Sequence, residues 1–175
     1  MKRSWIALVL SLVALTCLAP AQQPSPAARW EAWQSLIGFW AGEGEPDQGV
    51  SQFSFLPDLQ GKVLVRKNHA EYPATKDRPA AVHDDLLIVY GETDADRKAV
   101  YFDNEGHVIE YAVSVSADRK TIVFVSPAAA GAPRYRLSYF EQERGRFRIT
   151  FEIAPPGKPE AFAPYLEGFA RRKAG

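Results

Sequence analysis

Cysteine is nearly absent from this chain of 175 residues: Cys17 is the only one, and it lies in an apolar N-terminal segment. A domain that follows this segment has no disulfide, no catalytic thiol and no cysteine-ligated metal. An excess of charge is lacking as well, because 21 basic residues balance 21 acidic residues. With no basic field to attract phosphates, nucleic acid is excluded as an expected partner.

Motifs of common enzyme classes and internal repeats are also missing. The chain contains no G-x-S-x-G nucleophile elbow and neither of the close-spaced metal patterns H-x-H and H-E-x-x-H. No segment recurs with a period of about 20–50 residues, which argues against propellers and solenoids. Aromatic residues, in contrast, make up 12% of the chain, a share that suits strands and a lined cavity.

Residues 1–21 have the three parts of an export signal. Lys2 and Arg3 supply the positive start, and residues 5–15 form an apolar run that is too short to span a bilayer well. The small residues at 19–21 then fit a cleavage site. We therefore expect an exported protein, periplasmic or extracellular, with no membrane span in its mature chain.

Cleavage after this signal leaves a flexible leader over residues 22–28, which contains Pro24 and Pro26, and one domain over residues 29–175. The alternative is a lipoprotein signal that ends at Cys17, with a lipid anchor on the thiol. Thr16 stands where a lipobox usually has Gly or Ala, so the sequence fits that alternative poorly.

Aromatic and apolar residues recur with helical spacing at the start of the domain. In residues 29–36, Trp30, Trp33 and Leu36 are three residues apart, which places them on one face of a short helix. This pattern predicts a short N-terminal helix that closes one end of the fold with its two indoles.

After Gly38 the apolar residues alternate with polar ones at every second position. Residues 49–56, 107–116 and 146–153 show the alternation, and turn sequences such as 58–61 separate such segments. The pattern predicts about ten short strands with hairpin-length connections. We expect an all-β fold, a single antiparallel up-and-down barrel that closes on itself and leaves no free edge.

The residues at 38–44, GFWAGEG, resemble the G-x-W-x-G-x-G opening of nitrobindin-like domains and of bacterial barrel domains of unknown function. Both belong to the calycin superfamily, the lipocalin-like barrels. Later segments fit the same pattern: YFDNEGH at 101–107, RYRL at 134–137 and the terminal strand from Tyr165. The resemblance covers residues 30–173 and implies a calycin-like barrel.

In calycins an arginine of the last strand stacks on the tryptophan of the opening motif. The resemblance therefore implies that Trp40 forms the barrel floor with either Arg171 or Arg172, and strand parity does not choose between them. Nitrobindin-like domains bind haem through a histidine near the C-terminus. The last histidine of this chain is His107, so we expect no haem and no other cofactor.

Polar residues alternate with large apolar ones in residues 64–69, 134–140 and 146–153. The ordinary interpretation places the polar face in solvent, whereas a ligand-binding barrel can place polar side chains inside. Both interpretations stay open. The candidate ligand-binding residues are polar or aromatic side chains of these and neighbouring strands: Arg66, Asn68, His69, His83, Tyr101, His107, Tyr111, Arg136 and Glu152.

The sequence favours non-catalytic binding of a small apolar or amphipathic molecule inside the barrel. One alternative is a packed module that binds another envelope protein through the proline-rich loops at 73–82 and 155–164. The other is a hydrolase or isomerase-like enzyme that uses Tyr101, His107 and Glu110, or a metal held by the three histidines. The pattern assigns no catalytic residue and no metal ligand, and it leaves the oligomeric state open.

Overall fold

The computed structural model of the chain describes residues 26–44 and 49–174. The predicted export signal, Cys17 and most of the predicted leader lie outside the described residues. In the described part of the chain, neither helix has the length and apolarity needed to cross a membrane.

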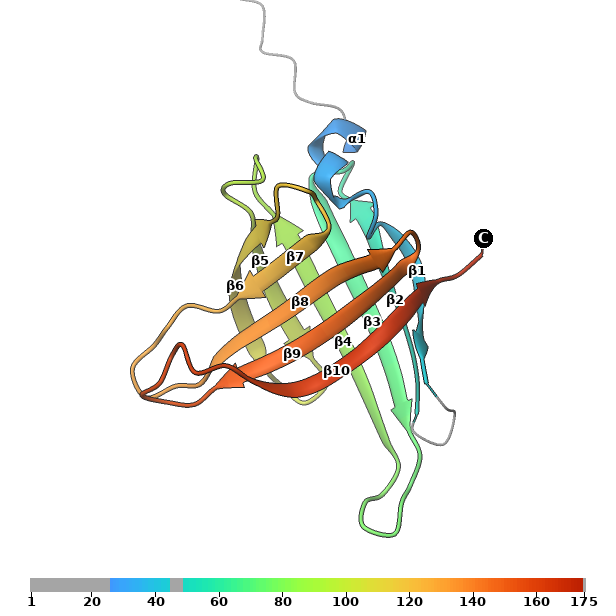
Figure 1. The fold of residues 1–175 in the computed structure, drawn as a ribbon, viewed down its shortest axis with the longest axis vertical. Helices are drawn as coiled ribbons and strands as arrows, with labels where there is room; N and C mark the ends of the chain where they lie inside the picture. Colours follow the sequence, from blue (N-terminus) through green and yellow to red (C-terminus); the bar gives the residue numbers. More distant parts are fainter. Residues whose placement is uncertain (1–25, 45–48, 175) are drawn as a thin grey trace, which may run out of the picture.

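The fold is a closed antiparallel barrel of ten strands, which confirms the predicted all-β meander (Figure 1). Each strand pairs with its neighbours in the sequence, and β1 pairs with β10 to close the barrel. The strands are β1 (Gly38–Glu43), β2 (Val50–Asp58), β3 (Val63–Tyr72), β4 (Ala81–Tyr90), β5 (Lys98–Asp103), β6 (Val108–Val115), β7 (Thr121–Val125), β8 (Arg134–Glu143), β9 (Arg146–Ala154) and β10 (Ala163–Arg172).

Alternation along each strand decides which side chains enter the barrel. In β6, Tyr111 and Val113 are buried, whereas Glu110, Ala112 and Ser114, which alternate with them, are exposed. Because successive side chains point to opposite faces, the same parity and the strand register assign an inner and an outer face to every strand.

The β2–β3 hairpin shows how the sequence sets this register. Leu59 and Gln60 have φ values of 48° and 57°, and Gly61 follows with φ 79°. The amide of Gly61 donates to the carbonyl of Asp58 at 2.9 Å, which closes the turn. Three successive left-handed residues reverse the chain tightly, so that Val63 pairs with Asp58.

The N-terminal segment closes one end of the barrel, as predicted, but it is not one helix. It consists of α1 (Pro26–Arg29) and a 3-10 turn, η1 (Glu31–Trp33), because Trp30 between them has φ −111° and ψ 24°, outside the helical region. Trp30, Trp33 and Leu36 are all fully buried. The guanidinium of Arg97 lies 4.1 Å from the Trp30 ring centroid and fixes this segment to the β4–β5 turn.

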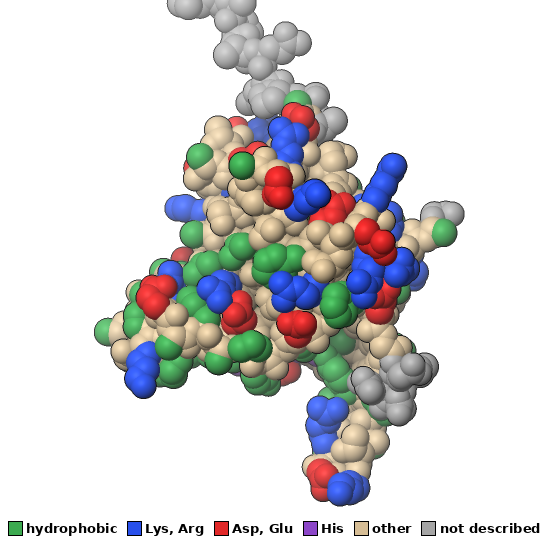
Figure 2. All heavy atoms as spheres, viewed as in Figure 1, with side chains coloured by type: hydrophobic (Ala, Val, Ile, Leu, Met, Phe, Trp, Pro, Cys, Tyr) green, Lys and Arg blue, Asp and Glu red, His purple; other side chains and the backbone are tan. Residues whose placement is uncertain are grey.

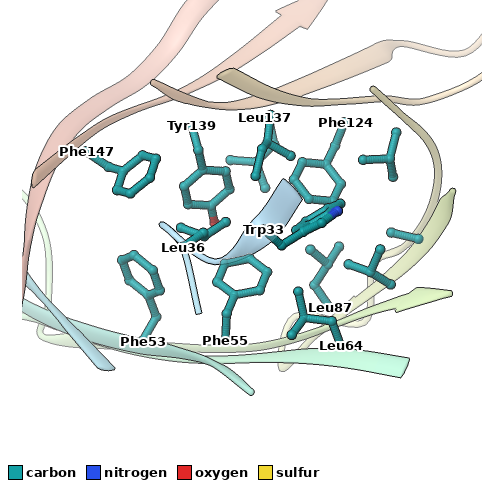
Figure 3. Close-up of a cluster of buried hydrophobic side chains, with 14 of the residues drawn as sticks. Trp33, Leu36, Phe53, Phe55, Leu64, Leu87, Phe124, Leu137, Tyr139 and Phe147 are labelled. Atoms are coloured by element: carbon teal, nitrogen blue, oxygen red, sulfur yellow. The ribbon is translucent and has the colours of Figure 1, made fainter. Parts of the chain in front are cut away.

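We call residues 26–36 the N-terminal plug, because this segment closes one end of the barrel. The main core fills the half of the barrel next to it. Figure 3 shows Trp33 and Leu36 inside a ring of strand side chains that includes Phe55, Phe124 and Tyr139. Phe55 and Phe124 contact Tyr139 edge to face, with centroids 5.5 and 6.1 Å apart. Such contacts stabilise a core beyond the burial of apolar area alone.

The floor is built around Trp40 and identifies its arginine partner. Trp40 lies opposite Arg172 in the β1–β10 register, and the Arg172 guanidinium carbon is 4.5 Å from the indole centroid. The same guanidinium donates to the carbonyls of Ile37 and Ser35. Arg171 has the opposite parity and pairs with Glu43 on the outer face. Of the two predicted candidates, Arg172 therefore stacks on Trp40.

Candidate functional site

The two ends of the barrel differ. The N-terminal plug covers the end with the β2–β3 and β4–β5 turns, and the opposite end carries the connections β3–β4, β5–β6, β7–β8 and β9–β10 (Figure 1). Near this opposite end, inward-facing side chains are only partly buried, as Tyr101, Ile109, Tyr135 and Phe151 show. We call this end the mouth of the barrel, because solvent reaches side chains of the inner face there.

Gly168 marks open space on the inner face. It has the parity of Ala170 and pairs with Ile149, so a side chain at this position would point into the barrel. A Cβ built on Gly168 meets no atom of the described residues within 4 Å, its chain neighbours aside. A glycine in a strand interior often stands where another group approaches the backbone closely.

One wall of the mouth is polar and begins with a buried ion pair. Arg66 and Asp85 face inward from β3 and β4, and the guanidinium donates to the carboxylate. Their side chains are 10% and 3% exposed, so each charge depends on the other for compensation. His83 continues the wall, with its Nε2 3.5 Å from the second Asp85 oxygen.

His83 also links the ion pair to the tyrosine of the next strand. Its Nε2 lies 3.1 Å from the Tyr101 hydroxyl, and its Nδ1 lies 3.1 Å from a carboxylate oxygen of Glu105. The hydrogen bond to Asp85 is the largest influence on His83. Burial opposes it and Glu105 supports it, and together they raise the pKa of His83 to about 9. His83 is therefore an imidazolium at neutral pH.

The wall ends at the β5–β6 turn. The Tyr101 hydroxyl donates to Asp103 at 3.2 Å, and the same carboxylate lies 2.8 Å from Nδ1 of His107. Burial favours the protonated form of Asp103, but hydrogen bonds from His107 and Glu105 outweigh it and lower the pKa of Asp103. Burial, supported by the Asp85 and Asp103 charges, raises the pKa of Tyr101. The hydroxyl consequently stays protonated and can donate.

The opposite wall is aromatic. Tyr135 of β8 stacks on Phe151 of β9, with centroids 5.9 Å apart and an interplanar angle of 8°. Tyr165 of β10 meets Phe151 edge to face at 6.1 Å. The mouth thus places fixed hydrogen-bonding groups on β3–β5 and flat apolar surface on β8–β10. This combination can hold a molecule that is apolar over most of its surface and polar at one part.

The predicted site residues divide between the inner and the outer face of the barrel, because successive residues of a strand point to opposite faces. Arg66, Asn68, His83, Tyr101 and Tyr111 lie on the inner face, and Arg66 with Tyr111 is deepest. His107 lies at the rim, where it binds Asp103. In residues 64–69, the strand register therefore places two polar side chains, Arg66 and Asn68, inside the barrel.

Three predicted residues lie on the outer face instead. Arg136 and Glu152 face each other across β8 and β9 and form two hydrogen bonds of 2.7 Å, because their neighbours Leu137 and Phe151 occupy the inner face. His69 pairs with Asp84 and Glu71 outside the barrel. The prediction that these three contribute to an interior cavity is not supported by their placement. Figure 2 shows acidic and basic side chains interspersed over the outer face of β8–β10.

The sequence prediction omitted four inward residues that matter to the site: Asp85, Asp103, Tyr139 and Gly168. An aspartate at the start of an apolar strand, as in the run from Asp85 to Tyr90, is a usable signal for a buried charge partner. Gly168 carries no such signal, because only the register shows that it faces inward.

The three histidines do not form a metal centre. Among residues 26–44 and 49–174, no group of three or more His, Cys, Asp or Glu side chains is arranged to hold a metal ion. His69 is on the outer face, and His83 and His107 bind different carboxylates.

Two shallow hollows lie beside the predicted proline-rich loops. The first, about 340 Å³, is lined by residues of β3–β4 that include Tyr72, Pro73 and Val82. The second, about 240 Å³, lies between residues 128–134 and the stretch that contains Gly157 and Pro159. Neither hollow is lined by the polar or the aromatic wall of the mouth.

Comparison with known proteins supports the fold and gives no family. No family model matches the chain, and no curated protein sequence matches it. Among solved structures, the crystal structure of Rv2717c from M. tuberculosis is similar, with a TM-score of 0.57 at 14% identity. The match covers 83% of this chain and 98% of that chain. At this identity the likeness extends to the barrel fold.

Proposed function

We propose that this protein is an exported, calycin-like barrel that binds a small, partly apolar molecule in the mouth half of its interior, without catalysis. The observation that carries the proposal is the open space at Gly168 on the inner face. It lies on β10, the strand that also carries Tyr165 of the aromatic wall.

The number of strands supports room for a ligand. Barrels of about eight strands are just wide enough to be filled by side chains or to hold one small ligand, and the diameter grows with strand number. This barrel has ten strands, and its large core aromatics gather around the N-terminal plug. Inner-face residues of the mouth half, such as Ile109 and Ile149, keep partial exposure.

The two walls define the kind of molecule. Tyr135 and Phe151 offer parallel aromatic faces that stack on a flat or aliphatic surface. The hydroxyl oxygen of Tyr101 can accept a hydrogen bond from a ligand, and its position is fixed because it donates to Asp103 and contacts Nε2 of His83. A fully apolar ligand would leave the polar wall without water, and a strongly polar ligand would gain little from the aromatic wall.

Binding of Nile red, a neutral dye that fluoresces in apolar surroundings, tests the proposal on the purified chain from residue 22 onward. Gly168→Trp fills the open space, and the backbone of Gly168 is outside the left-handed region, so a side chain is tolerated. We expect saturable binding to the wild type and at least about tenfold weaker binding to Gly168→Trp, which corresponds to a loss of about 1.4 kcal/mol.

Two controls accompany this variant. Gly168→Ala adds only a Cβ and should retain binding, and Ala112→Trp adds the same bulk on the exposed outer face of β6 and should also retain it. Native mass spectrometry of freshly purified protein would detect a co-purified ligand. Equal dye affinity for wild type and Gly168→Trp would refute an interior site at Gly168 and direct attention to the hollows beside the proline-rich loops.

A further inference from the structure

Apolar side chains form a continuous group on the outer face of β3–β6. The strand register sets them side by side in two rows that cross the strands: Val65, Ile88 and Val100 in the first, and Leu86, Phe102 and Val108 in the second. Phe102 and Val108 are 39% and 64% exposed, and the other four are partly exposed. We call these six residues the outer apolar patch. A contiguous exposed patch of this kind, unlike scattered apolar residues, is typical of an interaction surface.

Two charged side chains without partners border the patch at opposite corners. The register extends the first row to Glu110 on β6 and the second row to Lys67 on β3. Both are exposed, and neither side chain forms an ion pair or a hydrogen bond within the part of the chain that the structure describes. On the outer face of β8–β10, in contrast, Arg136 and Glu152 bind each other. The charges beside the patch are therefore available to a partner.

The apolar part of this surface is complementary to itself. A two-fold axis that runs along the strands between β4 and β5 sets β4 of one copy against β5 of a second copy, and β3 against β6. Ile88 then meets Val100 of the second copy, and Leu86 meets Phe102 of the second copy. An isologous interface requires that one surface match itself in this way.

The bordering charges match in the same arrangement. Lys67 and Glu110 of the second copy lie on facing strands, one row apart, which is about 7 Å along the strands. Both side chains are long enough to span this distance, and the lysine stem covers the apolar Val108 of the second copy on the way. Two such ion pairs lie on either side of the axis. Because opposite charges occupy opposite corners of one patch, a second copy of this chain is the partner that the patch fits.

We propose that the outer apolar patch is the interface of a homodimer with this two-fold symmetry. The patch and the outward residues that flank it cover about 19 by 27 Å, or about 500 Å² on each copy. A total of about 1,000 Å² is at the low end of specific interfaces, so we expect a reversible dimer with Kd on the order of 10–100 µM. The inference goes beyond the proposed function, because the ligand and the second copy would occupy opposite faces of the same strands.

Sedimentation velocity of the chain from residue 22 onward, at neutral pH and from about 1 to about 300 µM, brackets the expected Kd. The wild type should pass from monomer to dimer over this range. Phe102→Glu places a charge at the centre of the interface in both copies and should weaken the dimer at least about a hundredfold. Phe39→Glu is the matched control, because Phe39 is 57% exposed on β1, outside the patch, and should leave the dimer unchanged.

A charge exchange tests the two-fold arrangement itself. Lys67→Glu and Glu110→Lys each set two pairs of like charges against each other, so each should weaken the dimer about tenfold. The double variant exchanges the charges and should restore the wild-type Kd to within about threefold. Both positions are exposed on the outer face, so neither change should affect folding.

Three results would overturn the proposal. The first is a wild-type monomer at every concentration, and the second is a dimer that Phe102→Glu leaves intact, which would place the interface elsewhere. The third is a double variant as weak as the single variants, because Lys67 and Glu110 would then not face each other across the interface. None of these results bears on ligand binding, so the proposed function stands or falls separately on the Gly168→Trp experiment.

Discussion

At the scale of single residues, ion pairs of the same chemistry occur on both faces of the barrel wall, but only the pair on the inner face is buried. Arg66 and Asp85 compensate each other inside the barrel, whereas Arg136 and Glu152 form their ion pair on the outer face, with side chains 34% and 16% exposed. The two pairs have the same chemistry but different surroundings. Their contributions to stability should therefore differ in size.

Asp85→Ala should lower the free energy of unfolding by about 3–5 kcal/mol, because it leaves the buried Arg66 charge without compensation. Glu152→Ala removes the partner of a half-exposed arginine and should lower it by about 1 kcal/mol or less. Urea denaturation of both variants measures the difference. Equal losses would show that water reaches Arg66 as freely as it reaches Arg136.

His83 should make the folded protein less stable as the pH rises. Its pKa is raised from 6.5 to about 9 in the folded protein, so the folded state binds the proton more tightly than the unfolded state. The stabilisation is complete below about pH 6.5 and is lost as pH rises through about 9. The free energy of unfolding should therefore fall over this range.

His83→Gln should flatten that fall. His69→Gln is the matched control, because the pKa of His69 is also raised, by Glu71 first and then Asp84, but on the exposed outer face. Urea denaturation across the same pH range compares the three proteins. A wild-type curve that stays level through pH 9, or one that His69→Gln flattens more, would contradict the role given to His83.

The sequence pattern predicted the candidate ligand-binding residues as one set, and it could not separate those that face inward from His69, Arg136 and Glu152, which face outward. Alternation divides each strand into two faces without saying which face is inside. In β3 the two faces carry comparable numbers of polar residues, so only pairing with β4 resolves them. Long-range register, which local pattern does not contain, is the missing information.

At the scale of elements, the N-terminal plug and the last strand are joined by one side chain. Arg172 stacks on Trp40 of β1 and donates to two carbonyls of the segment that leads into β1. Arg171, its neighbour on β10, pairs with Glu43 in solvent and is 59% exposed. Substitution of Arg171 is therefore a matched control for substitution of Arg172.

Arg172→Ala should lower the free energy of unfolding by about 1–3 kcal/mol, from the lost cation–π contact and the unpaired carbonyls. Arg171→Ala should cost under about 1 kcal/mol. Chemical denaturation followed by tryptophan fluorescence measures both. Similar losses for the two variants would mean that the stacking on Trp40 does not fasten the plug.

The existence of the plug was predictable because Trp30, Trp33 and Leu36 share one spacing. Its division into α1 and η1 was not, because the non-helical backbone of Trp30 follows from contacts far away in the sequence. The Trp30 indole donates to the carbonyl of Gly61 at 2.9 Å, and Arg97 covers its ring. Tertiary packing outweighs the local preference of a segment this short.

At the scale of the whole molecule, the inward-facing side chains are fully buried next to the N-terminal plug and partly exposed toward the mouth. The strand count, order and closure were predictable from alternation and turn spacing, since a meander of short hairpins has few other ways to cover its edges. This difference between the two halves was not predictable. It depends on which inner positions carry small residues, and Gly168 is recognised only once β10 is placed against β9.

The most direct test of the binding site uses NMR of isoleucine methyl groups during titration with Nile red. Ile109 and Ile149 face inward in the mouth half, and Ile88 faces outward on β4. A ligand in the mouth half should shift the methyl signals of Ile109 and Ile149 and leave Ile88 in place. Saturating shifts at Ile88 alone, or no shift at any of the three methyls, would contradict an interior binding site.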